Sequence, residues 1–388
     1  MSIDTRAALN AQDTHIYDML GVRPFINAAG TYTRLGGSRM PPVVVEAMVE
    51  ASRHFVEIDE LQARAGARLA ELTRNEAAYV TCGAAAGLLV ATAACLAGND
   101  PARARQLPDL TGMRSDIVMY HSHRNPYDYA VRTLPIRLIE VGFPNEVIPP
   151  TPWELEHALT DQTAAVIYVE ARWTARGALP LDEVVAIAHR RDIPVIVDAA
   201  AQLPPRENLW RLTQAGADLV IFSGGKDLRG PQSSGLIVGR RDLVDACFLI
   251  GAPHHGICRP LKAGKEEIVG LVAAVERYMA QDEEARLLWT ERFVDRAIEQ
   301  LSGPGVEVRR CFPNEAGQPI PRALVTFMGD DAGRRRDHVI HLLQAGRPSV
   351  EVAPAGLDGL YVNPMTVDTY EEDPLFDRLC AAMAGSRA

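Results

Sequence analysis

Short apolar segments alternate with helical stretches between about residues 77 and 240 of this 388-residue chain. Apolar segments of strand length occur at residues 77–81, 116–120, 164–169, 193–197 and 218–222. Buried strands that alternate with helices are typical of a mostly parallel sheet with helices on both faces, so we predict an α/β fold. Such sheets bind ligands beyond the carboxyl ends of their strands, and we expect a functional site there.

One of these strands leads into residues 222–235, FSGGKDLRGPQSSG, which carry Lys226 among small residues. The glycines of this segment allow the backbone to approach a ligand closely. A lysine in such surroundings can lose its water shell, which lowers its pKa and makes the neutral amine available for a Schiff base. The alternative is a loop lysine that points into water, as most lysines do.

A second strand end favours the functional interpretation. Residues 193–202, IPVIVDAAAQ, form an apolar strand that ends in Asp198 and continues through three alanines to Gln202. Such a carboxylate can bind the protonated nitrogen of a pyridine ring, while the alanines, Ala200 among them, pack against the face of the ring. We therefore predict a cofactor site that contains Lys226, Asp198, Ala200 and Gln202.

These segments resemble the fold-type-I pyridoxal-phosphate enzymes, and among them the family of selenocysteine synthase (seryl-tRNA selenium transferase) and D-glucosaminate-6-phosphate ammonia-lyase. Residues 26–31 (INAAGT), 79–88 (YVTCGAAAGL) and 259–266 (RPLKAGKE) are similar as well. The resemblance implies a smaller α+β C-terminal domain beside the large domain, pyridoxal 5′-phosphate as the cofactor, and at least a homodimer with active sites between subunits. Lys226 would then hold the cofactor, and Asp198 would keep its ring nitrogen protonated.

The segment after the strand at residues 77–81 is a candidate for binding the cofactor phosphate. Residues 82–87 separate this strand from an apolar helix, so free backbone N–H groups and the helix dipole favour an anion. We assign Cys82, Gly83 and Ala84 to the phosphate, with Ser223 as a source of a hydroxyl. Close helix packing is the alternative. Because the family often has a hydroxyl or amide residue where Cys82 stands, more of the binding would fall to backbone groups.

Two histidines, His121 and His123, follow the strand at residues 116–120. In related enzymes a residue after this strand stacks on the open face of the cofactor ring, and an imidazole there can also transfer protons. We expect His123 to contact the cofactor and to be catalytic, with His121 as the second choice. A structural role is the alternative.

Several cationic side chains are candidates for binding the substrate. Arg259 and Lys262 lie in a locally positive segment of an acidic protein, which favours an anion such as the substrate carboxylate or the cofactor phosphate. Arg34 lies in the N-terminal loop that approaches the active site in related enzymes. Arg347 or Arg322 could be the carboxylate-binding arginine that family members commonly have in the C-terminal domain. The alternative for each is a solvated surface position.

The composition restricts the expected partners and compartment. A net charge of −10 argues against a large nucleic-acid surface, and so against a tRNA substrate, because phosphate backbones require clustered Lys and Arg. The six cysteines have no paired metal spacing, so we expect free thiols and no metal site. The N-terminus lacks a signal-peptide pattern and no apolar run is long enough to span a bilayer, so we expect a cytoplasmic protein without a membrane partner.

We expect three parts: an N-terminal arm at residues 1–40, a cofactor-binding large domain at 41–265, and a linking helix with a small domain at 266–388. One helix is expected from residue 266 to about residue 300. Strand-like segments at 306–310, 322–328, 349–353 and 359–362 and helical segments at 334–344 and 375–384 follow it. This pattern predicts an α+β domain with an antiparallel sheet.

Several reactions share the first chemical step that this site predicts, the removal of a proton from the carbon that bears the substrate's nitrogen. The resemblance favours α,β-elimination from a small amino acid or amino-sugar acid, through an external aldimine and an α-carbanion. Racemisation or epimerisation is the alternative, with His123 or Cys82 as the second acid/base group. Selenium transfer to seryl-tRNA is disfavoured by the acidic charge. A non-catalytic relative is disfavoured because Lys226 and Asp198 are both present.

Overall fold

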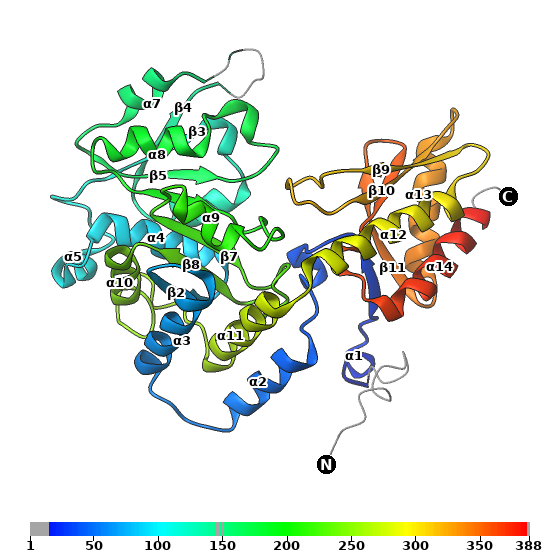
Figure 1. Ribbon diagram of the computed structural model, residues 1–388, viewed down its shortest axis with the longest axis horizontal. Coiled ribbons are helices and arrows are strands. Elements are labelled where there is room, and N and C mark those ends of the chain that lie inside the picture. Colours follow the sequence, from blue (N-terminus) through cyan, green and yellow to red (C-terminus); the bar gives the residue numbers. More distant parts are fainter. Residues whose placement is uncertain (1–14, 144–147, 149, 386–388) are drawn as a thin grey trace. The chain divides into compact units, whose positions relative to one another are not determined.

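The computed structural model describes residues 15–143, 148 and 150–385, which form two compact units (Figure 1). The larger unit comprises residues 36–283 and 315–318. The smaller unit comprises the described residues up to 35, residues 284–314 and the described residues from 319 onward. The larger compact unit continues to residue 283, beyond the domain boundary expected at residue 265. That boundary stays a prediction.

A seven-stranded sheet forms the centre of the larger unit, in the order β2-β8-β7-β6-β5-β3-β4. Its strands are β2 (Ala77–Thr81), β3 (Asp116–Tyr120), β4 (Arg137–Val141), β5 (Thr163–Val169), β6 (Val195–Asp198), β7 (Leu219–Ser223) and β8 (Gly235–Gly239). β3 to β7 pair in parallel, whereas β8 is antiparallel to both β7 and β2. The short connection between β7 and β8 contains no crossover helix, which allows only an antiparallel pair.

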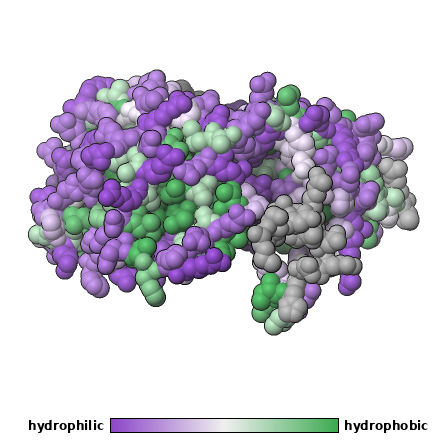
Figure 2. Space-filling model, turned by 60° about the horizontal axis from the view of Figure 1, so that its bottom comes forward, coloured by the Kyte–Doolittle hydropathy of each residue, from purple (hydrophilic) through white to green (hydrophobic). Residues whose placement is uncertain are grey.

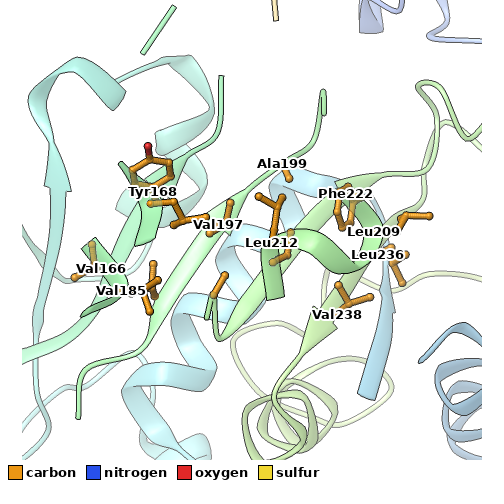
Figure 3. Close-up of a cluster of buried hydrophobic side chains, with 14 of the residues drawn as sticks. Val166, Tyr168, Val185, Val197, Ala199, Leu209, Leu212, Phe222, Leu236 and Val238 are labelled. Carbon is orange, nitrogen blue, oxygen red and sulfur yellow. The ribbon is translucent and has the colours of Figure 1, made fainter. Parts of the chain in front are cut away.

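Helices cover both faces of this sheet because successive strand residues point to opposite sides. On one face, Figure 3 shows Val166, Val197 and Phe222 of three strands with Leu209 and Leu212 of α9. The helices of this face are α3 (Ile58–Thr73), α7 (Pro152–Ala158), α8 (Leu181–His189), α9 (Asn208–Gln214) and α11 (Lys265–Ala280). The other face is covered by α4 (Ala84–Ala97), α5 (Pro101–Gln106), α6 (Tyr129–Arg132) and α10 (Arg241–Ile250).

The helix α2 (Pro42–Ser52) packs against α11 at a glycine. A Cβ atom on Gly270 would lie 2.7 Å from Pro231 Cγ and 2.8 Å from Met48 Cγ. The small residue therefore lets α11 lie close to both α2 and the segment that follows Lys226.

The smaller unit contains a five-stranded sheet in the order β1-β11-β12-β10-β9. Its strands are β1 (Phe25–Ala28), β9 (Val306–Cys311), β10 (Arg322–Phe327), β11 (Ser349–Ala355) and β12 (Gly359–Val362). Its helices include α1 (His15–Met19), α13 (Ala332–Ala345), α14 (Glu372–Gly385) and nearly all of α12 (Glu283–Leu301). All strand pairs are antiparallel except β1 with β11, so the predicted α+β domain with an antiparallel sheet is largely confirmed.

The single helix expected from residue 266 to about residue 300 is wrong, because α11 ends at Ala280 and α12 begins at Glu283. The guanidinium of Arg206 donates to Met279 O at 2.8 Å and to Gln281 O at 3.1 Å. Its backbone N–H donates to Glu283 Oε1 at 2.9 Å. These bonds satisfy the carbonyl groups at the end of α11 and stabilise the break.

Candidate active site

The carboxyl ends of β2, β3, β5, β6 and β7 meet at one edge of the larger sheet, because these strands run in the same direction. Cys82 follows β2, Asp198 ends β6, and Lys226 lies three residues beyond β7. His123 lies in the short 3-10 helix that follows β3. The residues that the sequence assigned to one site are thus brought to one edge of the sheet.

Asp198 is buried, with 8% of its surface exposed, between β5 and β7. Its Oδ1 accepts a hydrogen bond of 3.0 Å from the backbone N–H of Ala200. Burial raises the pKa of the carboxyl group, whereas the Ala200 N–H and the charge of Lys226 act in the opposite direction. Water solvates this buried carboxylate poorly. The carboxylate would therefore favour a cationic group placed against it.

Lys226 has a lowered pKa because its amine is largely withdrawn from water. The carboxylates of Asp198 and Glu315 raise the same pKa and partly offset the burial. Within the described part of the chain, the amine makes no hydrogen bond and no ion pair. A lysine that loses its proton readily and is not tied to a partner is suited to act as a nucleophile.

The backbone around Lys226 is tightly packed, and its glycines are required by close contacts. A Cβ atom on Gly224 would lie 2.0 Å from Ser234 Oγ, and one on Gly225 would lie 2.5 Å from Gln232 Cα. The glycines therefore let the segment after β7 fold back onto the segment that precedes β8. Lys226 is thereby presented from a fixed loop rather than from a mobile one.

Ser38 holds this loop from the N-terminal side, a contact that the sequence did not predict. Its Oγ donates to Lys226 O at 2.6 Å and lies 3.0 Å from Gly225 O, and its backbone N–H also donates to Gly225 O at 3.0 Å. A Cβ atom on Gly37 would lie 2.6 Å from Gly225 O. Two adjacent glycines, Gly36 and Gly37, precede Ser38, and both have positive φ. This pair of glycines is the feature of the sequence that could have indicated the contact.

The turn at residues 82–84 forms the amino end of α4, where the N-cap residue is Gly83 and no described side chain caps the helix. Gly83 has φ of 116°, which favours glycine, and Thr81 Oγ1 donates to Gly83 O at 2.9 Å. The backbone N–H groups of residues 84–86 have no acceptor among the described residues. Burial raises the pKa of the Cys82 thiol, so this side chain stays uncharged near neutral pH. These free N–H groups can bind an anion.

Ser223 and Gln202 differ in the contacts that the structure assigns to them. Ser223 is the partly exposed last residue of β7, and its hydroxyl makes no hydrogen bond within the described residues. The side-chain amide of Gln202 instead donates to Ala316 O at 3.0 Å. Gln202 therefore binds the segment at residues 315–318, and the cofactor contact expected of it stays a prediction.

His123 is fully buried, against Tyr120 and Tyr168 at ring-centre distances of 5.4 and 4.6 Å. Its Nδ1 accepts a hydrogen bond of 3.1 Å from the N–H of Val169, and burial lowers its pKa to about 3. The imidazole is therefore neutral near pH 7, with its proton on Nε2, which has no partner among the described residues. In this position His123 can donate a hydrogen bond, but it is not suited to accept a proton.

The second histidine and four of the candidate substrate cations are exposed or partly exposed. His121 is partly exposed and pairs with Glu140. Arg259 and Lys262 lie in the loop before α11, and neither side chain forms a hydrogen bond or ion pair with a described residue. Arg34 and Arg347 are exposed side chains of the smaller unit. Binding of substrate by these four cations stays a prediction for each of them.

Arg322 has a structural environment that differs from the one expected for a substrate ligand. It is buried, and its guanidinium lies 4.0 Å from the ring centre of Tyr361. The neighbouring strands β10 and β12 carry these two residues. The stacking anchors Arg322 within the smaller unit.

All six cysteines are free thiols in the part of the chain that the structure describes. Residues 15–143, 148 and 150–385 hold no group of three or more His, Cys, Asp or Glu side chains arranged to bind a metal ion. Among the helices of the same residues, none combines the length and the apolar character needed to cross a bilayer.

Sequence comparisons identify relatives that cover nearly the whole chain. The family model described as L-seryl-tRNA selenium transferase matches residues 25–319. A 5′-C-glycyluridine monooxygenase-decarboxylase of Streptomyces sp is 39% identical, over 94% of this chain and 90% of the relative. A D-glucosaminate-6-phosphate ammonia lyase of Salmonella typhimurium is 36% identical, over 87% of this chain and 88% of the relative. An L-seryl-tRNA(Sec) selenium transferase of Nitratidesulfovibrio vulgaris is 28% identical, over 92% and 76%.

Solved structures confirm the expected fold. The structure of a D-glucosaminate-6-phosphate ammonia-lyase has a TM-score of 0.83 at 32% identity, and the match covers 97% of this chain and all (100%) of that one. A Sphingomonas wittichii serine palmitoyltransferase has a TM-score of 0.60 at 15% identity, over 94% and 88% of the two chains. Both are fold-type-I pyridoxal-phosphate enzymes, and the second likeness concerns the fold alone.

Proposed function

This chain belongs to the L-seryl-tRNA selenium transferase family, and from that premise we propose that it is a pyridoxal 5′-phosphate enzyme acting on a small amino acid or amino-sugar acid. The observation that carries the proposal is the pair of Asp198 and Lys226. Both lie at neighbouring strand ends, one a buried carboxyl group and the other an amine with a lowered pKa. Enzyme relatives at 39% and 36% identity support an enzymatic role.

The residues present fit the cofactor in charge and in hydrogen-bonding capacity. Asp198 would bind the protonated ring nitrogen, and the Ala200 N–H would keep that carboxylate ionised. The N–H groups at residues 84–86, with the hydroxyl of Ser223, would hold the phosphate. We assign Cys82, Gly83 and Ala84 to this phosphate contact. The Nε2–H of His123 would donate a hydrogen bond rather than transfer a proton.

When bound, the cofactor withdraws electrons from the carbon that carries the substrate's nitrogen. Lys226 would be the base that removes the proton from this carbon. Its lowered pKa favours the neutral amine, the form that can act as a base, and the charge of Asp198 on the neighbouring strand would stabilise the ammonium that forms. Ser38 keeps the Lys226 loop in place during this step through its bonds to Gly225 O and Lys226 O.

We favour α,β-elimination as the reaction. The base removes the proton from the α-carbon and the β-hydroxyl leaves with a proton as water. Addition of water to the resulting enamine then releases ammonia and a keto acid. The water molecule lost in the elimination is thus replaced by the one used in the hydrolysis. The ammonia lyase relatives, one at 36% sequence identity and one with a structural TM-score of 0.83, support this choice.

A second candidate reaction is oxidative decarboxylation. The relative at 39% identity is named a monooxygenase-decarboxylase, which implies for that protein a use of dioxygen and a loss of carbon dioxide. The same α-carbon chemistry at Lys226 would precede either reaction. Racemisation, the alternative inferred from the sequence, requires a second acid/base group, and the buried neutral His123 is a poor one. Selenium transfer remains disfavoured by the net charge of −10.

Product analysis separates these reactions. The protein loaded with pyridoxal 5′-phosphate is incubated with D- and L-amino acids and with D-glucosaminate, with and without its 6-phosphate. We expect ammonia and a keto acid without oxygen consumption. Oxygen consumption with carbon dioxide release would instead establish decarboxylation, and inversion of configuration without ammonia would establish racemisation. Lys265→Ala is the matched control for Lys226→Ala, because the Lys265 amine is bonded to Ala51 O at 2.9 Å.

A further inference from the structure

The turn that runs from Ala199 to Gln202, directly after Asp198, is fastened at its start and at its end. At its start the Ala199 N–H donates to Ile221 O of the neighbouring strand β7 at 3.0 Å. At its end the Gln202 N–H donates back to Ala199 O, also at 3.0 Å. Ala200 lies between these two bonds, and its N–H donates to Asp198 Oδ1 at 3.0 Å. The position of this N–H therefore depends on both ends of the turn.

The side chain and the carbonyl group of Gln202 hold the second end of the turn. Gln202 is 8% exposed, and its Nε2 donates to Ala316 O at 3.0 Å. The same oxygen accepts a bond of 3.3 Å from the backbone N–H of Arg172. Gln202 O accepts a bond of 2.7 Å from Nδ2 of the buried Asn208. Movement of Gln202 would leave several buried polar groups without partners, which is unfavourable.

The Ala200 N–H acts on the protonation of Asp198. Among the described residues it provides the hydrogen bond that the Asp198 side chain accepts, and Lys226 is the charged group that acts on this carboxylate. Burial raises the pKa of Asp198, whereas the Ala200 N–H and Lys226 lower it. If the bond from Ala200 is weakened, the carboxylate takes up a proton at a higher pH. A protonated carboxyl group cannot balance the charge of a cationic ring nitrogen.

We propose that Gln202 is a positioning residue for Asp198, which keeps the Ala200 N–H bonded to the carboxylate instead of binding the cofactor itself. This inference rests on the proposed function, in which Asp198 binds the ring nitrogen of pyridoxal 5′-phosphate. Side chains that meet a ligand have to be held by hydrogen bonds from residues behind them. Gln202 supplies that support through the turn, since its amide is already bonded to Ala316 O.

The pH dependence of cofactor-site affinity tests the proposal. Gln202→Met removes the amide but keeps an unbranched side chain of similar length. The probe is 4′-deoxypyridoxine 5′-phosphate, which has the ring nitrogen and the phosphate but cannot form a Schiff base with Lys226. Calorimetry measures its dissociation constant for the cofactor-free full chain between about pH 5 and pH 8. The titration of the probe's own nitrogen is common to all variants.

We expect Gln202→Met to raise the dissociation constant of the probe by about two- to tenfold near pH 7, as loss of one neutral hydrogen bond implies. The factor should grow as the pH falls. A further rise in the pKa of Asp198 means that its carboxylate is lost at a higher pH, so the decline in affinity on acidification begins earlier. Amide hydrogen exchange in residues 199–203 of the cofactor-free chain should become faster as well.

A matched control and a second variant accompany this experiment. Gln106→Met removes an amide that is bonded to Thr111 O at 2.8 Å and should change neither the affinity nor its pH dependence. Asn208→Leu removes the bond to Gln202 O, so it should act in the same direction as Gln202→Met. It also keeps the proposal testable if Gln202→Met does not fold. Thermal unfolding of each variant measures the loss of stability separately.

Three results would overturn the inference. Weaker binding by the same factor at every pH would show that Gln202 contacts the ligand directly. Lower thermal stability with unchanged affinity and pH dependence would show a role in stability alone. In both cases the proposed function stands, because the wild-type chain binds the probe. If the wild-type chain binds no probe and forms no visible band with pyridoxal 5′-phosphate, the proposed function fails and the inference fails with it.

Discussion

Burial changes the pKa values of Asp198 and Lys226 in opposite directions, upward for the acid and downward for the amine. Each of the two charges partly restores the ionised form of the other. The amine of Lys226 can therefore be neutral while the carboxylate of Asp198 is able to bind a cation. Lys226 and Asp198 were predicted from the sequence because each follows an apolar strand and has small residues beside it, glycines around Lys226 and alanines after Asp198.

A change at Asp198 tests this coupling directly. Asp198→Asn removes a negative charge that raises the Lys226 pKa, so the pKa of Lys226 should fall further and its amine should be neutral down to lower pH. The rate of labelling of Lys226 by an amine reagent, followed by mass spectrometry against pH in the cofactor-free protein, measures this midpoint. Loss of the ion contact should also weaken cofactor binding by about ten- to a hundredfold.

The exposed Asp245 of α10 provides the control for that experiment. Asp245→Asn should leave the labelling midpoint of Lys226 unchanged. A midpoint that stays constant or rises in Asp198→Asn would show that the two groups are not coupled as described.

The proton position on His123 could not be predicted from the sequence. It depends on a hydrogen bond from Val169, which is 46 residues away in the chain, and on complete burial between two tyrosine rings. The sequence shows only that His123 follows a strand. Its expected catalytic role therefore stays a prediction, whereas its neutral, donor-only state follows from the structure.

At the scale of elements, the loop after β7 depends on a contact from a distant segment. Ser38→Ala removes hydrogen bonds to Gly225 O and Lys226 O and should lower the free energy of unfolding by about 0.5–3 kcal/mol. Amide hydrogen exchange in residues 224–230 should become faster at the same time. Urea unfolding and exchange measured by mass spectrometry check both effects.

The comparison variant is Ser52→Ala, which removes a hydroxyl that is bonded to Val49 O on the exposed surface of α2. It should leave exchange in residues 224–230 unaffected. Equal exchange rates in Ser38→Ala and the wild-type chain would mean that Ser38 does not hold the lysine loop.

The turn before α4 depends on a glycine in the neighbouring strand. A Cβ atom on Gly235 of β8 would lie 2.5 Å from the Gly83 carbonyl carbon and 2.6 Å from Thr81 Oγ1. Gly235→Ala should therefore displace the turn, lower the free energy of unfolding by about 1–3 kcal/mol and weaken cofactor binding.

Gly256→Ala is the matched control, since the nearest atom to its Cβ would be 3.9 Å away. Thermal unfolding and cofactor titration of both variants provide the comparison. If Gly235→Ala retains wild-type stability and cofactor affinity, the close approach of β8 to the turn has no functional importance.

Strand positions followed from the sequence better than strand pairing did. β3 has the predicted bounds, and β5 and β7 differ from the prediction by one residue at most at each end, because their apolar runs are short and clearly bounded. The pairing of β1 with β11 joins segments more than 300 residues apart and leaves no local signal. The antiparallel direction of β8 also depends on its neighbours rather than on its own residues.

At the scale of the whole molecule, the family was predicted correctly because its motifs are spread over most of the chain and bear the cofactor chemistry. The reaction was not determined in the same way, because relatives with similar motifs are named for elimination, for oxidative decarboxylation and for selenium transfer.

The association state is a further prediction at this scale. We expect at least a homodimer, with a mass of twice the 42.3 kDa of one chain in light scattering. Figure 2 shows hydrophobic residues gathered on one face of the molecule. α2 and the loop that follows it expose Val43, Val45, Val49, Phe55 and Val56. Burial of such side chains favours association.

Phe55→Ser with Val56→Ser should weaken that association, whereas Leu357→Ser, a change at another exposed apolar residue, in the smaller unit, should not. Light scattering at several protein concentrations measures the effect. A wild-type mass equal to one chain at all concentrations would contradict the expected dimer.

The central claim is that Lys226 holds pyridoxal 5′-phosphate, and an absorbance spectrum tests it most directly. The purified wild-type chain, Lys226→Ala and Lys265→Ala are incubated with the cofactor, freed of excess and scanned in the visible range. We predict a visible band in the wild-type chain and in Lys265→Ala, and its loss in Lys226→Ala. No band in the wild-type chain, or an unchanged band in Lys226→Ala, would contradict the account.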